Sequence, residues 1–165
     1  TVVEGDAVAE VARWPQPVDV VVSVDAAYHF HTREGFFAAA RKTGARTLAA
    51  SDICLSRAWE STRLTLPRKL LLWLISNVAG VPRENLAAGP LALARQLTQA
   101  GWHDPDVAVV TDRVLLPFSA HCLHRARTQQ RLGWRSWFVL WSSGWFMRFL
   151  GSCGAVDVVM YRARA

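Results

Sequence analysis

The feature that most restricts the fold is an alternation of strand-like and helix-like segments. The run VDVVVSV at Val18–Val24 has the composition of a strand buried on both faces of a sheet. A helical pattern follows at Arg33–Lys42, with Thr32 as its N-cap and Gly44 as its C-terminal stop. Strands that alternate with helices indicate an α/β domain with a largely parallel sheet.

The remaining segments continue this alternation along the whole chain. We expect five strands. Besides the one at Val18–Val24, they lie at Thr1–Glu4, Thr47–Ser51, Val107–Thr111 and Val156–Arg162, and the last two could form an antiparallel edge. Further helices are expected at Ala7–Trp14, Pro67–Ala79, Leu86–Ala100 and Ala120–Leu150, the last with breaks at Gly133 and Gly144.

Composition and charge narrow the possible partners. With 165 residues, 52% of them hydrophobic and 19% charged, the chain suffices for one domain with a sizeable core and is not disordered. From Arg113 to the C-terminus there are eight Arg, no Lys and one acidic residue, Asp157. This half is either a solvated basic face or a surface for acidic lipid. No Lys/Arg-rich run or base-stacking pattern indicates nucleic acid.

The cysteines and the N-terminus bear on localisation. Cys54, Cys122 and Cys153 are odd in number and widely spaced, so they form no zinc or disulfide framework and suit a reducing, cytoplasmic compartment. His121 and His124 alone would make a poor metal site, and no metal is expected. The chain opens with Thr in a strand-like run and without a signal peptide, which favours a fragment.

Polar side chains follow two of the predicted strands. Asp25, Tyr28 and His29 come directly after the valine-rich strand, and Asp52 follows the next strand. In an open α/β sheet, ligands bind beyond the carboxyl ends of the strands, so these residues predict a small-molecule site. A histidine there suits a general base. Each residue also has a structural interpretation: Asp25 as a loop carboxylate, Tyr28 as a packing residue, His29 as a hydrogen-bonded histidine and Asp52 as a strand-end cap.

A tryptophan stripe marks the C-terminal third. Trp134, Trp137, Trp141 and Trp145 recur at helical spacing and share one face of a helix. Such a stripe suits core packing, the wall of an apolar ligand site or a membrane interface. A membrane span over Trp137–Val156 is not favoured, because it would place Arg148 near the bilayer centre and the chain must return to the sheet.

Four segments together resemble one enzyme family. GDA at Gly5–Ala7, VDVVVSVDAAYHF at Val18–Phe30, TREGFFAAARK at Thr32–Lys42 and RTLAASDI at Arg46–Ile53 resemble class I S-adenosylmethionine-dependent methyltransferases. The small-molecule group related to ubiquinone, tocopherol and sterol methyltransferases is the most similar. The resemblance covers nearly the whole chain, but the glycine-rich cofactor loop of type GxGxG is absent.

The resemblance implies a fold and a cofactor site. The implied fold is the α/β, Rossmann-like methyltransferase sheet in an incomplete form, with its third to seventh strands and a helical C-terminal cap. Residues 1–165 would then be the C-terminal two-thirds of a single domain. The cofactor would be S-adenosyl-L-methionine, and the residues implied to bind it are Gly5, Asp6, Ala7, Ser23, Val24 and Asp25. The carboxylate of Asp6 would accept the adenine amino group or, alternatively, would only cap the helix that follows.

The implied activity is methyl transfer to a small, hydrophobic or lipid-like acceptor. His29 and Tyr28 are the catalytic candidates, and the predicted substrate contacts are Phe30, Asp52, Trp137 and Trp141. The basic, Trp-rich C-terminal third would cap the pocket or contact a membrane peripherally. The alternative is a non-catalytic, methyltransferase-like remnant that binds a partner or a membrane surface. If the native protein is this chain alone, we expect weak or no cofactor binding, because strands of the central sheet would be missing.

Overall fold

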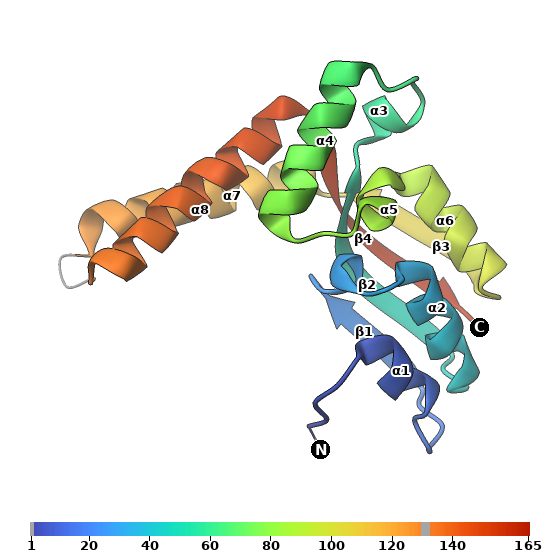
Figure 1. Cartoon of the computed structure of the whole chain (residues 1–165). Helices are drawn as coiled ribbons and strands as arrows, with labels where there is room; N and C mark the ends of the chain where they lie inside the picture. The colour runs from blue at the N-terminus through green and yellow to red at the C-terminus, as the bar shows by residue number, and fades with distance from the viewer. Residues whose placement is uncertain (1, 130–132) are drawn as a thin grey trace.

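The computed structural model describes residues 2–129 and 133–165, and its elements alternate in an α/β pattern (Figure 1). In chain order they are α1 (Ala7–Ala12), β1 (Val20–Val24), the 3-10 turn η1 (Ala27–His29), α2 (Arg33–Lys42), β2 (Thr47–Leu55), α3 (Arg57–Glu60), α4 (Leu66–Ala79), α5 (Arg83–Ala87), α6 (Pro90–Gln99), β3 (His103–Val109), α7 (Thr111–Thr128), α8 (Trp134–Cys153) and β4 (Val156–Arg164).

The four strands form one mixed sheet in the order β1-β2-β4-β3. β1 pairs with β2 in parallel, with Val20 opposite Thr47, whereas β4 runs antiparallel to both of its neighbours. The last two strands pair antiparallel, an arrangement that the sequence pattern left open, with β3 at one edge of the sheet and β1 at the other. The Rossmann-like α/β class predicted from the sequence is therefore the observed one, with an incomplete sheet.

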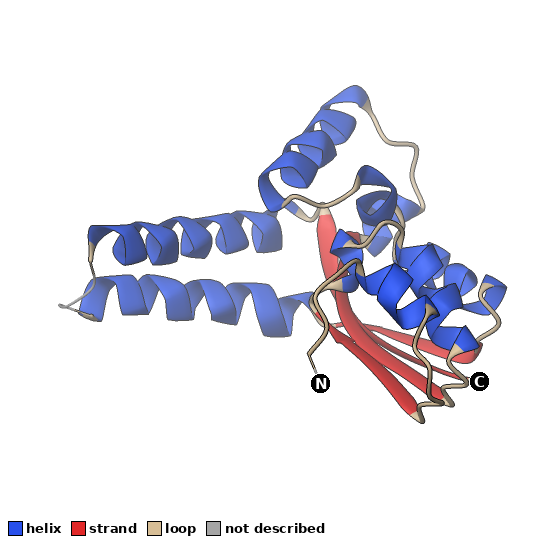
Figure 2. Cartoon of the chain, turned by 60° about the horizontal axis from the view of Figure 1, so that its bottom comes forward, coloured by secondary structure: helices blue, strands red, loops and turns tan. Residues whose placement is uncertain are grey.

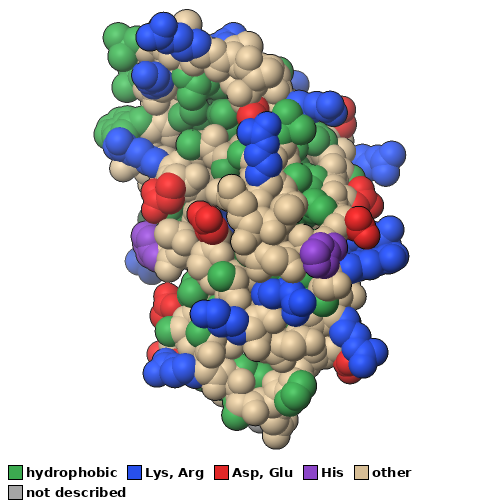
Figure 3. Space-filling view, turned by 90° about the vertical axis from the view of Figure 1, so that its right-hand side faces the viewer, with side chains coloured by type: hydrophobic (Ala, Val, Ile, Leu, Met, Phe, Trp, Pro, Cys, Tyr) green, Lys and Arg blue, Asp and Glu red, His purple; other side chains and the backbone are tan. Residues whose placement is uncertain are grey.

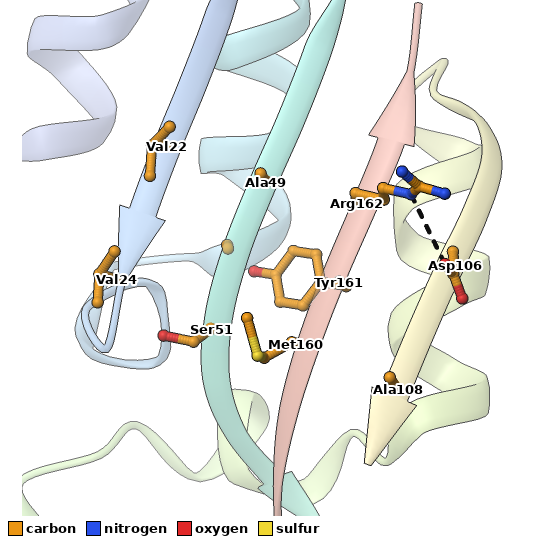
Figure 4. A pocket seen from close by; sticks show the side chains of 10 residues that line it. Val22, Val24, Ala49, Ser51, Asp106, Ala108, Met160, Tyr161 and Arg162 are labelled. Atoms are coloured by element: carbon orange, nitrogen blue, oxygen red, sulfur yellow. Dashed lines mark ion pairs between the residues drawn. The ribbon is translucent and has the colours of Figure 1, made fainter. Parts of the chain in front are cut away.

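The two faces of the sheet are covered differently. Helices α1, α2 and α6 lie along one face (Figure 2), where Phe37, Leu48 and Trp102 are fully buried. On the other face Val20, Val22 and Val24 are 52–71% exposed. With side chains of β2, β3 and β4, Val22 and Val24 line an open trough of about 410 Å³ (Figure 4). The prediction that this strand is buried on both faces is therefore wrong for the face that carries these valines.

Three strand predictions differ clearly from the structure. β3 spans His103–Val109 and so begins four residues before the predicted Val107, and Thr111 begins α7 instead of ending the strand. Val2–Glu4 is not part of a strand, and Val2 and Val3 are exposed, because no described strand lies beside them to pair with; Thr1 lies outside the described residues. β2 continues to Leu55 instead of ending at Ser51, since β4 pairs with it over its whole length. Asp52 therefore lies inside a strand and not after it.

The helix boundaries near glycine or proline match the expected ones in some places and not in others. The helix predicted at Leu86–Ala100 is divided into α5 and α6 because Pro90 lacks an amide N–H and disfavours helical geometry at Gly89, which has an extended φ and ψ. The break predicted at Gly133 is confirmed, since α8 begins directly after it. The break predicted at Gly144 is wrong: α8 continues through it, because Gly144 packs against Leu123 of α7.

Helices α7 and α8 form an antiparallel hairpin that projects from the sheet (Figures 1 and 2). The carboxyl end of β3 leads into α7, and α8 returns to β4. We call this hairpin, Thr111–Thr128 with Trp134–Cys153, the arm. At its base, Leu115 and Leu150 join a core cluster that also contains Tyr28.

Candidate active site at the carboxyl ends of the strands

The carboxyl end of β1 leads into an unusual backbone turn. Asp25 has a φ of 52°, in the left-handed region that asparagine and aspartate tolerate better than most residues. Its amide N–H lies 3.1 Å from both the carbonyl oxygen and the Oγ of Ser51, on the neighbouring strand. The chain is thereby turned so that η1 lies over the end of the sheet, and Asp25 remains exposed.

Tyr28 is buried beneath this turn. Its hydroxyl donates a hydrogen bond to Oδ1 of Asp25 at 2.9 Å. Burial, and then the hydrogen bond to the Asp25 carboxylate, raise the pKa of Tyr28 well above the usual tyrosine value. Tyr28 is therefore a neutral phenol near pH 7. In this form it is a hydrogen-bond donor to Asp25.

His29 is exposed beside Tyr28, and its two ring nitrogens differ. Nδ1 lies 3.0 Å from the carbonyl oxygen of Gly80, the left-handed residue that ends α4. Because a carbonyl only accepts, Nδ1 is the nitrogen that donates, and in the neutral ring Nε2 then carries the lone pair. The rings of His29 and Tyr28 lie 4.3 Å apart, which fixes the imidazole from one side. A positioned imidazole with a free Nε2 is the arrangement that a general base requires.

A second polar cluster lies just behind the first and is completely buried. The guanidinium of Arg33 donates to Oδ2 of Asp52 at 3.1 Å, and both side chains are 0% exposed. The hydroxyl of Tyr161 donates to the same carboxylate oxygen at 3.2 Å, and the backbone N–H of Tyr28 donates to Oδ1 at 2.9 Å. Burial raises the pKa of Asp52, while the Arg33 guanidinium acts in the opposite direction.

The substrate contact predicted for Asp52 does not fit this position. Its carboxylate is enclosed and accepts hydrogen bonds from four residues, including the amide of Ile53, so no surface is left for a substrate. Its contact with the amide of Tyr28 gives it a different role, which is to hold η1 at the end of the sheet.

Asn85 of α5 connects the two clusters. Its side-chain nitrogen donates to the carbonyl oxygens of Tyr28 at 2.9 Å and Phe30 at 2.8 Å. Its own backbone carbonyl accepts from Arg33 at 2.6 Å. The segment that carries His29 is therefore anchored on both sides by buried hydrogen bonds.

The residues predicted to bind the cofactor lie near the same edge. Asp6 caps α1, its Oδ1 accepting from the amide of Ala9 at 2.8 Å, and it is exposed, as is Gly5. Ala7 opens α1, whose next residue, Val8, packs beside Gly35 in the first turn of α2. Ser23 is buried, and its Oγ has no hydrogen-bond partner among the described residues. Val24 points to the bare face of the sheet (Figure 4).

Three further residues were predicted to contact substrate. Phe30 is partly withdrawn from solvent, and the two tryptophans lie apart from His29. Phe30 is half-buried and packs edge-on against Phe36 at 5.1 Å, within the helix-covered core. Trp137 and Trp141 stack on each other at 5.9 Å on the arm, which points away from the sheet (Figure 1). Neither belongs to the core cluster that contains Tyr28. The structure thus brings Asp25, Tyr28 and His29 together and leaves both tryptophans outside this group.

Sequence reasoning missed Arg33 and Asn85, although Arg33 leaves a trace in the sequence. A cation in the first turn of a helix opposes the helix dipole, so an arginine there calls for a carboxylate partner. A charged residue inside the apolar run AASDICL calls for a cation in the same way. Asn85 gives no comparable signal, because its partners are backbone carbonyls that only the tertiary fold brings near it.

Comparisons with known proteins place this fold. No protein-family model matches the sequence, and no curated protein matches it at a significant level. Among solved structures, the chain is similar to a putative sarcosine dimethylglycine methyltransferase from Galdieria sulphuraria, with a TM-score of 0.72 and 12% identity, covering 93% of this chain and 56% of that one.

Two further structures give the same result. A cyclopropane synthase from Mycobacterium tuberculosis has a TM-score of 0.64 and 20% identity, over 94% of this chain and 58% of that one. A phosphoethanolamine N-methyltransferase from Haemonchus contortus, solved with S-adenosylhomocysteine, has a TM-score of 0.66 and 12% identity, over 93% of this chain and 36% of that one. The chain thus spans about a third to three fifths of the length of these structures, and over that span it has the fold that they share.

Proposed function

We propose that this chain forms the acceptor-side part of a methyltransferase that uses S-adenosyl-L-methionine and acts on a small, apolar molecule. The observation that carries the proposal is the open group of Asp25, Tyr28 and His29 at the carboxyl end of β1, on a fold shared with such enzymes. Within that class we favour the group related to ubiquinone, tocopherol and sterol methyltransferases, on the sequence motifs given above.

His29 would act as the general base. Nδ1 donates to Gly80, so Nε2 is free to take a proton from a hydroxyl, an amine or an activated carbon of the acceptor. Tyr28 would hold Asp25 by its 2.9 Å hydrogen bond and support the imidazole ring by packing. The buried pair of Arg33 and Asp52 would keep this segment in place, which is a positioning role.

The polar residues at this edge fit part of a cofactor site. When bound, S-adenosyl-L-methionine supplies an electrophilic methyl group. Asp6 uses its Oδ1 to cap α1, so its second, exposed carboxylate oxygen suits the amino group of adenine. The exposed Asp25 suits the methionine end.

The surroundings of His29 support an apolar acceptor. Helix α4 ends at Gly80, whose carbonyl holds His29, and one side of this helix carries exposed apolar side chains: Leu66, Leu70, Trp73, Leu74 and Val78. An exposed stripe of this kind on the element next to a candidate base suits the wall of an apolar ligand site.

Methyl transfer to a panel of apolar acceptors tests this function. The natural full-length protein would be incubated with methyl-labelled S-adenosyl-L-methionine and quinols, sterols, prenyl diphosphates and unsaturated phospholipids. We expect labelled product from at least one acceptor and loss of that product in His29→Gln, with S-adenosylhomocysteine binding retained. His121→Gln, on the exposed surface of the arm, is the matched control and should keep full activity. Equal turnover by His29→Gln would remove His29 as the base.

A further inference from the structure

Helix α8 is apolar on nearly all sides and yet only half covered. Its 20 residues include four Trp, three Phe and four aliphatic or Met side chains, whereas Arg135 and Arg148 are its only charged residues. A helix with this composition is normally buried all round. In the structure, however, only Gly144 and Leu150 of this helix are fully buried. The remaining apolar surface is unfavourable in water, so we expect it to contact a further apolar or interfacial surface.

The packed side of α8 is determined by small residues. The backbone of α7 and α8 approaches closely at Gly144, where an added Cβ would lie 2.7 Å from the side chain of Leu123. The hydroxyl of Ser119 donates to the carbonyl of Gly144 at 2.7 Å, and Gly151 packs against Leu116. This seam fixes the rotation of α8 about its axis, so the large aromatic side chains face outward.

The outward side forms a continuous aromatic face. Five aromatic side chains recur every three or four residues, and Phe138 lies beside them on the helix. The six are 42–73% exposed: Trp134, Trp137, Phe138, Trp141, Trp145 and Phe149. Trp137 and Trp141 stack with an angle of only 16° between their rings. The apolar side chains of an ordinary soluble surface are scattered singly, whereas these six form one contiguous patch.

The same arm is strongly basic. The arm has five Arg and no Lys, and Asp112 in the first turn of α7 is its single acidic residue. Arg135 lies over the ring of Trp134 at 5.6 Å and Arg148 over the ring of Trp145 at 5.7 Å. None of the arm's described arginines forms an ion pair with another described residue. By contrast, basic and acidic side chains are intermixed on the side of the molecule that carries α6 (Figure 3).

We propose that the arm binds the surface of an anionic lipid bilayer, with the aromatic face of α8 in the headgroup region and the arginines at the lipid phosphates. Tryptophan favours this interface because its ring is apolar and its N–H can hydrogen-bond, and arginine pairs with phosphate in a bidentate manner. No described helix is long and apolar enough to cross a membrane, so the arm lies on the bilayer. A second copy of the chain fits less well, since two arginine-rich faces would repel each other. The proposal does not depend on methyl transfer.

Vesicle binding tests the proposal directly. The protein would be mixed with phosphatidylcholine vesicles that contain about 30% phosphatidylserine and, separately, with phosphatidylcholine alone. We expect binding to the anionic vesicles with a blue shift of tryptophan emission, at least about 10-fold weaker binding to phosphatidylcholine, and release by salt. Equal binding to both vesicles, or binding to neither, would overturn the proposal.

Matched variants locate the surface. Arg135→Gln and Arg148→Gln should each weaken binding about 5-fold, and Trp137→Ser with Trp141→Ser should weaken it more than about 10-fold. These side chains are exposed, so folding should be kept, and circular dichroism would verify it. Val22→Ser with Val24→Ser, on the bare sheet face, is the control and should bind as before. Loss of binding in this control but not in the arm variants would assign the membrane contact to the sheet and contradict the proposal. A stable dimer abolished by the tryptophan changes would do the same.

Discussion

Asp25, which directly follows β1, and Asp52, inside the neighbouring β2, lie close to each other in the register of the sheet, but their surroundings differ. Asp52 is 1% exposed and accepts hydrogen bonds from Arg33, Tyr161 and the amide of Tyr28. Asp25 is exposed and accepts from the hydroxyl of Tyr28. The buried cluster thus holds the backbone, and the open cluster presents groups to a ligand. Tyr28 belongs to both, through its amide and its hydroxyl.

The largest expected effect comes from leaving Asp52 without its cation. Arg33→Met should lower the free energy of unfolding by about 3–5 kcal/mol, because a buried carboxylate would lose its charged partner. Urea unfolding followed by circular dichroism would measure it. Arg46→Met, which removes an exposed pair with Asp19, is the control and should change stability by less than about 1 kcal/mol. A small loss in Arg33→Met would mean that the buried pair does not hold the fold.

Removal of the base in the open cluster should act on turnover and leave stability intact. His29→Gln should lower kcat by roughly 10²–10⁴-fold with an acceptor found by the screen, since the proton would lose its acceptor. The free energy of unfolding should change by less than about 0.5 kcal/mol, because the side chain is exposed. A large stability loss with unchanged turnover would place His29 with the structural residues instead.

Removal of the Asn85 side chain, which links the two clusters, should lower both the stability and the turnover, each by less than the changes above. Asn85→Ala removes the donor to the carbonyls of Tyr28 and Phe30 and should cost about 1–3 kcal/mol of unfolding free energy. We also expect a smaller fall in kcat, and no fall in the double variant beyond that of His29→Gln alone, because both changes remove the base from its position. Additive losses of activity would show that Asn85 acts independently of His29.

The smallest expected effect is a decrease in the free energy of unfolding as the pH rises in the alkaline range. The pKa values of Tyr28 and Tyr161 are raised by burial, whereas in the unfolded chain both titrate near 10.0. Above that pH the unfolded chain releases protons that the folded protein keeps, so stability falls as pH rises, by about 1.4 kcal/mol per pH unit for each tyrosine. Below it the contribution is constant.

The two tyrosines can be separated, because the chain has no others. Tyr28→Phe should remove half of the tyrosine contribution to the slope, and the double Phe variant should remove all of it. Urea unfolding at pH values from 8 to about 11 would measure the difference from the wild type. An unchanged slope in the double variant would contradict the buried, protonated state of both phenols.

The sequence predicted the open cluster better than the buried one. Local patterns were enough for the helix at Arg33–Lys42 with its Thr32 cap, and for the position of Asp25 after a strand. The buried cluster depends on contacts between residues far apart in the chain, such as Tyr161 with Asp52, which no local pattern contains. For the same reason β2 was predicted too short, since its last residues are strand only through pairing with β4.

Coverage of the sheet was equally hard to predict. Val20, Val22 and Val24 have the composition of a strand buried on both faces, but the described residues cover only one face. The tryptophan stripe on α8 was recognised from its spacing, yet its exposure depends on how Gly144 and Gly151 pack against α7. Periodicity identifies which residues share a face, whereas tertiary packing decides what that face meets.

Calorimetric titration with S-adenosylhomocysteine is the experiment we would perform first, on the natural full-length protein and on three variants. We predict one binding site, at least about 10-fold weaker in Asp6→Ala, because the adenine amino group would lose its acceptor. Asp19→Ala, at the opposite end of β1, and His29→Gln should both bind like the wild type. No binding by the wild type, or binding that is insensitive to Asp6→Ala and lost in Asp19→Ala, would contradict a cofactor site at the carboxyl ends of these strands.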